Sequence, residues 1–309
     1  MKVCVIGDSG LLGQALVRKL AGRHSVLGIS SAGLGVLMNG NYRHQACDVI
    51  REASLLKDAI YDYKPRLVIN CAGLADVAQC EKNPDLALAL NARFPAVLAE
   101  LASREGSELI HISTDQVFDG KKNSPYVEED DAHPAHQYGI TKRKGEMEVS
   151  RIFPKALIVR TNIVGFRDIA GKPTFAEWLC DALNDREPIT LATDFITSSI
   201  HVDLFSDNLW DLYQSKASGL WHLASEDAAS KYEFGFCVSR ALNADFSHVK
   251  KGVLSDLGLN PSRPGYLAMN SDKAKRMMRR DLPQVHSTAE KVAGDYLTRK
   301  KRRVDVPKK

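Results

Sequence analysis

The chain has 309 residues, which is long enough for one large or two smaller domains. With 44% hydrophobic and 26% charged residues, its composition is that of a folded globular protein and excludes a disordered or fibrous chain. The net charge of +4 comes from the C-terminal segment 297–309, in which seven basic residues face one acid. We expect this segment to be a disordered basic tail, with contact to an anionic surface as the alternative, and we expect no nucleic-acid partner.

The cysteines and apolar runs give expectations about location and metals. Six cysteines contain no CxxC pair, and the histidines show no metal-binding spacing, so we expect free thiols, a cytoplasmic location and no metal site. The apolar start, Val3 to Ile6, is too short for a signal sequence, and we expect no membrane partner. A homodimer is left open.

Strand-like and helix-like patterns alternate in the first half of the chain and become irregular in the second. The predicted strands are 3–6, 25–29, 66–70, 109–113 and 156–161. The predicted helices are 12–20, 55–63, 84–103, 138–150, 174–184, 232–241 and 288–297. This order predicts an α/β fold, a Rossmann-type doubly wound parallel sheet with a smaller α-rich substrate domain. We expect the sheet domain to comprise 1–161 with part of 196–235, and the smaller domain 162–195 and 236–296.

A glycine-rich turn joins the first predicted strand to the first helix as GxxGxxG. Glycines there permit a tight turn and let the backbone approach a pyrophosphate, and the helix N-terminus presents free N–H groups to it. A structural turn of another α/β protein is the alternative. The turn residues expected to bind a dinucleotide are Gly7, Ser9, Gly10, Leu11, Leu12 and Gly13.

The end of the second strand bears on the choice of cofactor. An acid there would bind the ribose hydroxyls of NAD, but this chain has Ser30 and Ser31 and no acid before Asp48. Hydroxyl side chains leave room for a 2′-phosphate, so NADP(H) is favoured, with NAD(H) left open. Asp48 and Val49 are expected beside the adenine; the alternative role of Asp48 is to cap the next helix.

Two further strand ends are expected to face the cofactor. The small-residue turn Cys71, Ala72 and Gly73 closes the third strand, where a plain strand-ending turn is the alternative. Thr161 ends the fifth strand, and we place it beside the cofactor as well.

Tyr138 and Lys142 form a YxxxK pair four positions apart, so they share one face of a helix. A tyrosine is a poor proton donor at neutral pH unless its anion is stabilised, which a nearby ammonium does. Thr114, at the end of the fourth strand, can hydrogen-bond a substrate carbonyl. A YxxxK pair also occurs by chance, but the glycine turn, Thr114 and this pair follow one another in the order that ketone reduction needs.

These motifs resemble an extended short-chain dehydrogenase, and within that superfamily the dTDP-4-dehydrorhamnose reductase family. The motifs that carry the resemblance are GDSGLLG, NCAG, STDQVFDG, YGITK, RTNIVG and SRPG. The resemblance implies a nucleotide-linked 4-keto-6-deoxy sugar reduced by hydride from NAD(P)H. It makes Thr114, Tyr138 and Lys142 catalytic, with Tyr138 and Lys142 also at the cofactor.

The resemblance also implies roles for residues that spacing alone does not single out. It places Asn91 near the cofactor, where capping or packing is the alternative. It places Arg263 at the sugar nucleotide, where a surface ion pair is the alternative. The residues expected to contact substrate are Thr114, Asp115, Gln116, Asn162 and Arg263.

Two departures from the family pattern concern the substrate. Gln116 stands where the family usually has tyrosine, and the family's DQxGxPT loop is replaced by 193–199, TDFITSS. Asp115 is followed by an amide and not by a second carboxylate, which argues against a 4,6-dehydratase. The competing functions are a non-catalytic NADP-binding regulatory subunit on the same fold and a sugar-nucleotide epimerase.

Overall fold

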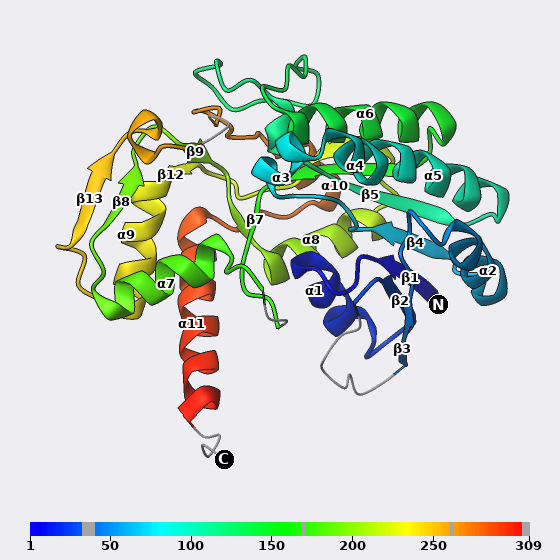
Figure 1. The fold of residues 1–309 in the computed structure, drawn as a ribbon, viewed down its shortest axis with the longest axis horizontal. Coiled ribbons are helices and arrows are strands. Elements are labelled where there is room, and N and C mark those ends of the chain that lie inside the picture. The colour runs from blue at the N-terminus through cyan, green and yellow to red at the C-terminus, as the bar shows by residue number, and fades with distance from the viewer. Residues whose placement is uncertain (33–40, 169–170, 260–262, 305–309) are drawn as a thin grey trace.

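A computed structural model describes residues 1–32, 41–168, 171–259 and 263–304. Its centre is a sheet of seven strands that all run parallel, with the order β11-β6-β5-β4-β1-β2-β3 (Figure 1). The strands are β1 (Lys2–Ile6), β2 (Ser25–Ser30), β3 (Tyr42–Ala46), β4 (Leu67–Asn70), β5 (Glu108–Thr114), β6 (Leu157–Thr161) and β11 (Gly219–His222). The chain order reverses between β1 and β4, so the predicted doubly wound Rossmann-type sheet is confirmed.

Helices cover both faces of the sheet, because the central strands carry apolar side chains on both faces that have to be buried. One face packs on α1 (Leu11–Leu20), α8 (Val202–Gln214) and α10 (Asp272–Met278). The other packs on α2 (Ala53–Tyr63), α5 (Phe94–Arg104) and α6 (Gln137–Ile152). Two short helices, α3 (Val77–Lys82) and α4 (Pro84–Leu88), precede α5. These helices pack on the two faces of the sheet and leave the carboxyl ends of the strands uncovered.

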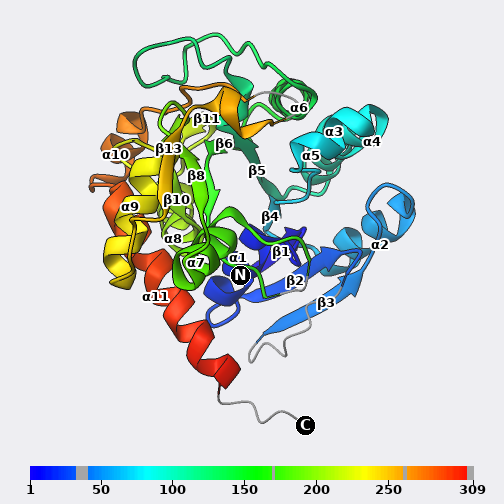
Figure 2. The same ribbon diagram turned by 60° about the vertical axis from the view of Figure 1, so that its left-hand side comes forward.

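A second hydrophobic core lies beside the sheet (Figure 2). It is built from the apolar faces of three helices with a parallel strand pair. These elements are α7 (Phe175–Asp185), α9 (Lys231–Leu242), α11 (Val285–Val304), β8 (Ile189–Ala192) and β13 (Val249–Gly252). Short strands run between this part and the sheet: β7 (Ile163–Val164), β9 (Ile196–Thr197), β10 (Ile200–His201) and β12 (Ala229–Ser230).

The hydrophobic cores divide the chain differently from the expected domain boundaries. Segment 267–282 was expected in the smaller domain, but Leu267 and Met269 pack against Phe118 beside the sheet. Ala274 and Leu282 then join the core under α8. The reason is that α10 returns to cover β11, the edge strand of the sheet. The division into a cofactor part and a substrate part stays a proposal.

The C-terminal segment differs from the expected disordered tail. Helix α11 continues to Val304, and residues 305–309 lie outside the described residues. Arg299 anchors the basic end of the helix by an ion pair with Asp168 (2.6 Å) and by packing over the Phe166 ring. The prediction of disorder from Leu297 onward is therefore wrong as far as Val304.

One helical stretch, Pro84–Arg104, is long and apolar enough to cross a membrane by length and composition, although the sequence analysis expected no such run. It is composed of α4, a π-helical turn (Ala89–Arg93) and α5. Phe94, Leu98 and Ala102 on α5 are buried in the core of the sheet. In this fold the stretch covers the sheet, which is a common use of apolar helices.

Candidate active site

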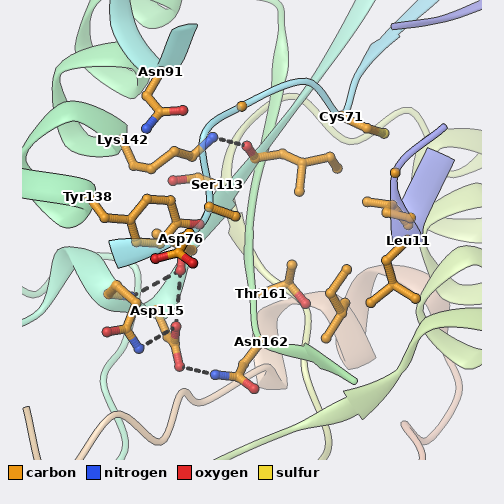
Figure 3. Close-up of a pocket in the computed structure, with 18 of the residues that line it drawn as sticks. Leu11, Cys71, Asp76, Asn91, Ser113, Asp115, Tyr138, Lys142, Thr161 and Asn162 are labelled. Carbon is orange, nitrogen blue, oxygen red and sulfur yellow. Dashed lines mark hydrogen bonds between the residues drawn. The ribbon is translucent and has the colours of Figure 1, made fainter. Parts of the chain in front are cut away.

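A cavity of about 640 Å³ opens at the carboxyl edge of the sheet, beside the turns that follow β1, β4, β5 and β6 (Figure 3). It brings together residues that lie far apart in the sequence. The predicted residues that line it are Gly10, Leu11, Leu12, Gly13, Cys71, Ala72, Gly73, Asn91, Thr114, Asp115, Gln116, Tyr138, Lys142, Thr161, Asn162 and Arg263. The predicted residues outside this lining are Gly7, Ser9, Ser30, Ser31, Asp48 and Val49.

Two positions of the glycine turn, Gly7 and Gly13, have no space for a side chain. Gly7 has φ +80°, and a Cβ there would lie 2.7 Å from the Ala72 nitrogen. A Cβ on Gly13 would lie 2.1 Å from the Gly7 oxygen. Gly10 caps α1, so the helix N-terminus opens directly into the cavity. Such a cradle suits the pyrophosphate of a dinucleotide.

The Thr161 hydroxyl, at the end of β6, is a second feature of the cavity that suits a bound cofactor. Its oxygen is buried and finds no hydrogen-bond partner among the described residues, although Thr161 lines the cavity. A buried hydroxyl without a partner indicates a missing polar group at that point.

Asn91 has a structural role that the sequence left open. Its Oδ1 accepts from the Leu74 nitrogen (2.8 Å), and its Nδ2 donates to the Leu74 oxygen (3.0 Å) and to Thr141 Oγ1 (3.1 Å). A Cβ on Gly145 would lie 2.2 Å from the Asn91 carbonyl oxygen. Asn91 therefore ties the turn after β4 to α6, which supports the packing alternative.

The ends of β2 and β3 lie at the same sheet edge as the glycine turn. Ser30 is buried and its hydroxyl donates to the Ala32 oxygen (2.7 Å), whereas Ser31 is exposed. Asp48 Oδ1 accepts from the backbone of Ile50 (3.0 Å) and Arg51 (3.2 Å). Asp48 therefore caps the turn that precedes α2 and not α2 itself, whose N-cap is Glu52, and Ser31 is exposed at the end of β2.

Tyr138 and Lys142 project from α6 toward the end of β5 (Figure 3). The Lys142 ammonium is almost fully buried and donates to the Ile112 oxygen (2.5 Å). The Tyr138 ring and the Thr114 side chain line the same cavity. The three predicted catalytic residues therefore meet in one cavity.

The electrostatics of Tyr138 differ from the expectation that Lys142 lowers its pKa. Burial raises the pKa of Tyr138 well above its ordinary value, the neighbouring Thr114 hydroxyl opposes this, and the Asp115 charge adds to it. Burial also lowers the pKa of Lys142 to about 8, with Glu146 and Cys71 opposing. The ammonium is directed at a carbonyl oxygen, so the pocket keeps the phenol in its protonated form.

A buried ion pair holds α6 against the sheet. Arg160 Nε and Nη2 each donate to a Glu146 carboxylate oxygen (2.8 Å), and Ser113 Oγ donates to Glu146 Oε1 (2.6 Å). Arg160 and Glu146 are almost completely buried, so their charges depend on each other. Glu146 lies one helical turn after Lys142 on α6. The ion pair therefore fixes the position of Lys142 relative to the sheet.

Asp115, which follows β5, accepts hydrogen bonds from three side chains in the cavity. Its Oδ1 accepts from Thr114 Oγ1 (3.1 Å) and Gln116 Nε2 (3.2 Å), and its Oδ2 accepts from Asn162 Nδ2 (2.5 Å) (Figure 3). The Gln116 Oε1 in turn accepts from His136 Nε2 (3.0 Å). His136 is the N-cap of α6, with Nδ1 accepting from the Gly139 nitrogen. Gln116 therefore links Asp115 to the start of α6.

The family model described as the RmlD substrate binding domain matches residues 1–297. The chain belongs to this family. The resemblance inferred from the sequence motifs is thereby confirmed.

Three similar proteins give this membership a context. A probable low-salt glycan biosynthesis reductase of Haloferax volcanii is 32% identical over 267 residues, 85% of this chain and 88% of the relative. The solved dTDP-4-dehydrorhamnose reductase of Clostridium acetobutylicum has a TM-score of 0.81 and 26% identity, with 96% of this chain and 100% of that chain covered. That of Bacillus anthracis, solved with NADP, has a TM-score of 0.79 and 24% identity, with 94% and 98% covered, and supports the fold.

Several cavity residues of this family member were missed by the sequence analysis. They include Asp76 at the N-cap of α3, and Arg167 and Thr174 from the irregular second half. Asp76 forms an ion pair with Lys172 (3.0 Å). Position after a strand end would have indicated Asp76, but Arg167 and Thr174 reach the cavity only through the packing of the smaller core. Phe195, which also lines the cavity, belongs to the loop 193–199 that the sequence had related to the substrate.

Among the described residues, His201, Asp203 and Asp295 lie close enough together to hold a metal ion. The Lys291 ammonium is 2.9 Å from Asp295 and 3.6 Å from Asp203, so the acids already share a cation. His201 Nδ1 accepts from the Asp203 nitrogen as the N-cap of α8. These contacts favour a structural cluster that joins α11 to α8.

Proposed function

We propose that the protein is an NADPH-dependent reductase that converts the 4-keto group of a nucleotide-linked deoxy sugar to an alcohol. The observation that carries this proposal is the single cavity in which Thr114, Tyr138 and Lys142 lie beside the glycine cradle of α1. Membership of the RmlD family supports the same chemistry.

The cofactor half of the cavity suits NADPH. The glycine turn and the N-terminus of α1 would hold the pyrophosphate, and Lys142 and Thr161 would face the nicotinamide half. The exposed Ser31 at the end of β2 leaves room for a 2′-phosphate where an acid would repel it. Bound NADPH supplies the hydride that reduces the ketone.

The residues of the substrate half then handle the carbonyl oxygen. Thr114 orients the carbonyl by a hydrogen bond, and the phenol of Tyr138 gives its proton to the oxygen as negative charge develops there. Because burial keeps Tyr138 protonated, it is ready to act as an acid at neutral pH. Solvent returns the proton to Tyr138 after product leaves.

The rim of the cavity would bind the nucleotide diphosphate. Arg263 lines the cavity and is half-buried, and an arginine can donate two parallel hydrogen bonds to phosphate oxygens. Phe195, from the altered loop 193–199, lines the same half. We therefore assign the choice of sugar and base to this loop.

The proposed function is tested by NADPH oxidation with a panel of 4-keto nucleotide sugars, including dTDP-4-dehydrorhamnose. We expect net reduction of at least one sugar, and several-fold tighter binding of NADPH than of NADH. Tight NADPH binding without turnover of any sugar would support the regulatory-subunit alternative. Inversion of a sugar without net NADPH consumption would support the epimerase, and an NADH preference would contradict the assignment of Ser31.

A further inference from the structure

Lys231 is the first residue of α9. It lies close to the proposed catalytic centre, which its position in the sequence did not indicate. Its ammonium donates to Thr197 Oγ1 (3.0 Å) and reaches Ser199 Oγ (3.4 Å). It also lies 5.1 and 5.0 Å from the ring centroids of Phe175 and Phe195. A lysine with two aromatic rings and two hydroxyls around it is held in one place.

A chain of hydrogen bonds runs from this lysine to Thr114, which lines the cavity together with Tyr138. Ser199 Oγ donates to Asn162 Oδ1 (2.8 Å), and Asn162 Nδ2 donates to Asp115 Oδ2 (2.5 Å). Thr114 Oγ1 donates to the other oxygen of Asp115 (3.1 Å).

The direction of this chain depends on the ammonium, because an ammonium can only donate hydrogen bonds. With Lys231 donating to Ser199, the Ser199 proton is directed to Asn162. The amide oxygen of Asn162 is then an acceptor, and its NH₂ group has to face Asp115. Asp115 fixes the Asn162 amide from the other side, because an ionised carboxylate can only accept. Without Lys231, the Ser199 and Thr197 hydroxyls, which lie 2.8 Å apart, lose the ammonium that donates to both.

Asp115 also needs a positive charge nearby. It is 1% exposed, and among the described residues it has no ion-pair partner at contact distance. The groups that face it are the Thr114 hydroxyl, the amides of Gln116 and Asn162, and the Tyr138 phenol, all uncharged. Burial raises the pKa of Asp115, and besides hydrogen bonds it is the charge of Lys231 that opposes this.

Asp115 in turn stabilises the charged form of Lys231. Burial lowers the pKa of Lys231 to about 8, and the charge of Asp115 is what opposes it. The other groups that face Lys231 are uncharged: the rings of Phe175 and Phe195 and the hydroxyls of Thr197 and Ser199.

We propose that Lys231 is a positioning residue for the reduction: its charge, and its hydrogen bonds through Ser199 and Asn162, keep Asp115 ionised and so fix the Thr114 hydroxyl that donates to Asp115. This rests on the proposed ketone reduction. It adds that the altered loop 193–199 and the catalytic centre are coupled through one lysine of α9, since Phe195, Thr197 and Ser199 all contact Lys231.

Three variants separate charge from hydrogen bonding. Lys231→Met removes both, Lys231→Gln keeps a donor without charge, and Lys231→Arg keeps the charge. Lys273→Met is the matched control, because the Lys273 ammonium donates to the Leu220 oxygen (2.7 Å) and lies 4.4 Å from the Trp221 ring centroid, outside the cavity.

The first measurement needs no turnover. The Asp115 carboxyl is titrated by ¹³C NMR in protein labelled at aspartate, with its signal identified by its loss in Asp115→Asn. A nearby positive charge typically lowers a carboxyl pKa by about 1–3. We expect the titration midpoint to move up by about one pH unit or more in the Met and Gln variants, and to stay near the wild-type value in the Arg and control variants.

The second measurement is the pH profile of kcat with the sugar that the wild type reduces fastest. Under this proposal the ionised form of Asp115 is the working form, so a raised Asp115 pKa moves the acid limb of the profile to higher pH in the Met and Gln variants. The loss of kcat is therefore largest at and below the Asp115 titration midpoint of the variant and shrinks as the pH rises above it, and KM for NADPH is unchanged.

An unchanged Asp115 titration in the Met and Gln variants overturns the proposal. So does an equal loss of kcat at every pH, which a merely structural role would produce. If the wild type reduces no sugar, the proposed function fails, while the NMR titration still decides whether Lys231 controls Asp115.

Discussion

At the scale of single residues, the surroundings of Tyr138 determine whether its phenol carries a proton. The Tyr138 phenol stays protonated because it is buried and because Asp115 lies near it, and Lys142 donates to the Ile112 carbonyl. An alkoxide formed from a ketone is far more basic than a phenolate, so a tyrosine with a raised pKa still gives up its proton to it. The pocket thus suits an acid that acts once negative charge appears on the substrate.

Replacing the phenol oxygen tests this role. Tyr138→Phe removes one oxygen atom, and general acid catalysis commonly contributes about 10²–10⁴-fold, so kcat should fall by that factor. The dissociation constant for NADPH should change little, because the glycine cradle is untouched. Steady-state kinetics and a cofactor titration check both. Near-normal turnover by this variant would exclude Tyr138 as the acid.

The sequence indicated the residues that we propose to be catalytic, but not their partners. Thr114, Tyr138 and Lys142 follow from a strand end and a helical spacing, both of which are local patterns. The links from Gln116 to His136 and from Lys231 to Ser199 join segments far apart in the chain. Such contacts depend on how the elements pack, and no local pattern indicates them.

At the scale of elements, the apolar strands and amphipathic helices were predictable, and the exposed or short ones were not. Strand β3 has the sequence YRHQA with no buried residue, so it has no strand-like apolar pattern. It forms because it pairs along β2 at the sheet edge. Helix α11 was cut short in the prediction because its basic end looked like a tail, yet Arg299 anchors it to Asp168.

The attachment of α11 gives a prediction of pH-dependent stability. Burial disfavours the charge of Asp295, but His201 and Lys291 outweigh it and lower the Asp295 pKa to about 2. A depressed folded-state pKa contributes stability above the unfolded pKa of about 4, and this contribution is lost as pH falls toward 2. Asp295→Asn should therefore cost about 2 kcal/mol at pH 7 and about half of that at pH 3.

Urea unfolding of wild type and variant at the two pH values measures this difference. Asp281→Asn is the control, because Asp281 pairs with Lys275 on the surface with 89% of its side chain exposed, and it should leave the unfolding midpoint unchanged. A pH-independent loss in Asp295→Asn would show that packing, and not charge, attaches α11.

At the scale of the whole molecule, the cavity lies where the sheet edge meets segments from the second half of the chain. The cofactor end is made by turns of the sheet, whereas Phe195, Thr174 and Arg263 come from segments after it. The fold class and the cofactor end were predictable because a parallel sheet brings its strand ends to one edge. The substrate end was indicated only in part, because residues such as Arg167 and Thr174 reach the cavity through irregular segments whose positions depend on the second core.

This arrangement predicts separate effects on substrate and cofactor for a change at Arg263. Removing one charged hydrogen-bond partner commonly costs about 1.5–3 kcal/mol, or roughly ten- to a hundredfold in binding. Arg263→Ala should raise KM for the nucleotide sugar by about that factor and leave the NADPH dissociation constant unchanged. Arg186→Ala is the control, because Arg186 pairs with Asp245 (3.2 Å) away from the cavity, and surface pairs contribute little.

The same kinetics decide what the altered loop does. If Arg263 binds the diphosphate, KM should rise by a similar factor for every nucleotide sugar that is reduced, because the diphosphate is common to all of them. The loop, through Phe195, should instead set the ranking among sugars and bases, which Arg263→Ala then leaves in place. An unchanged KM would remove Arg263 from the site. Faster turnover of dTDP-4-dehydrorhamnose than of every other sugar in the panel would show that the TDFITSS loop keeps the ordinary specificity of the family.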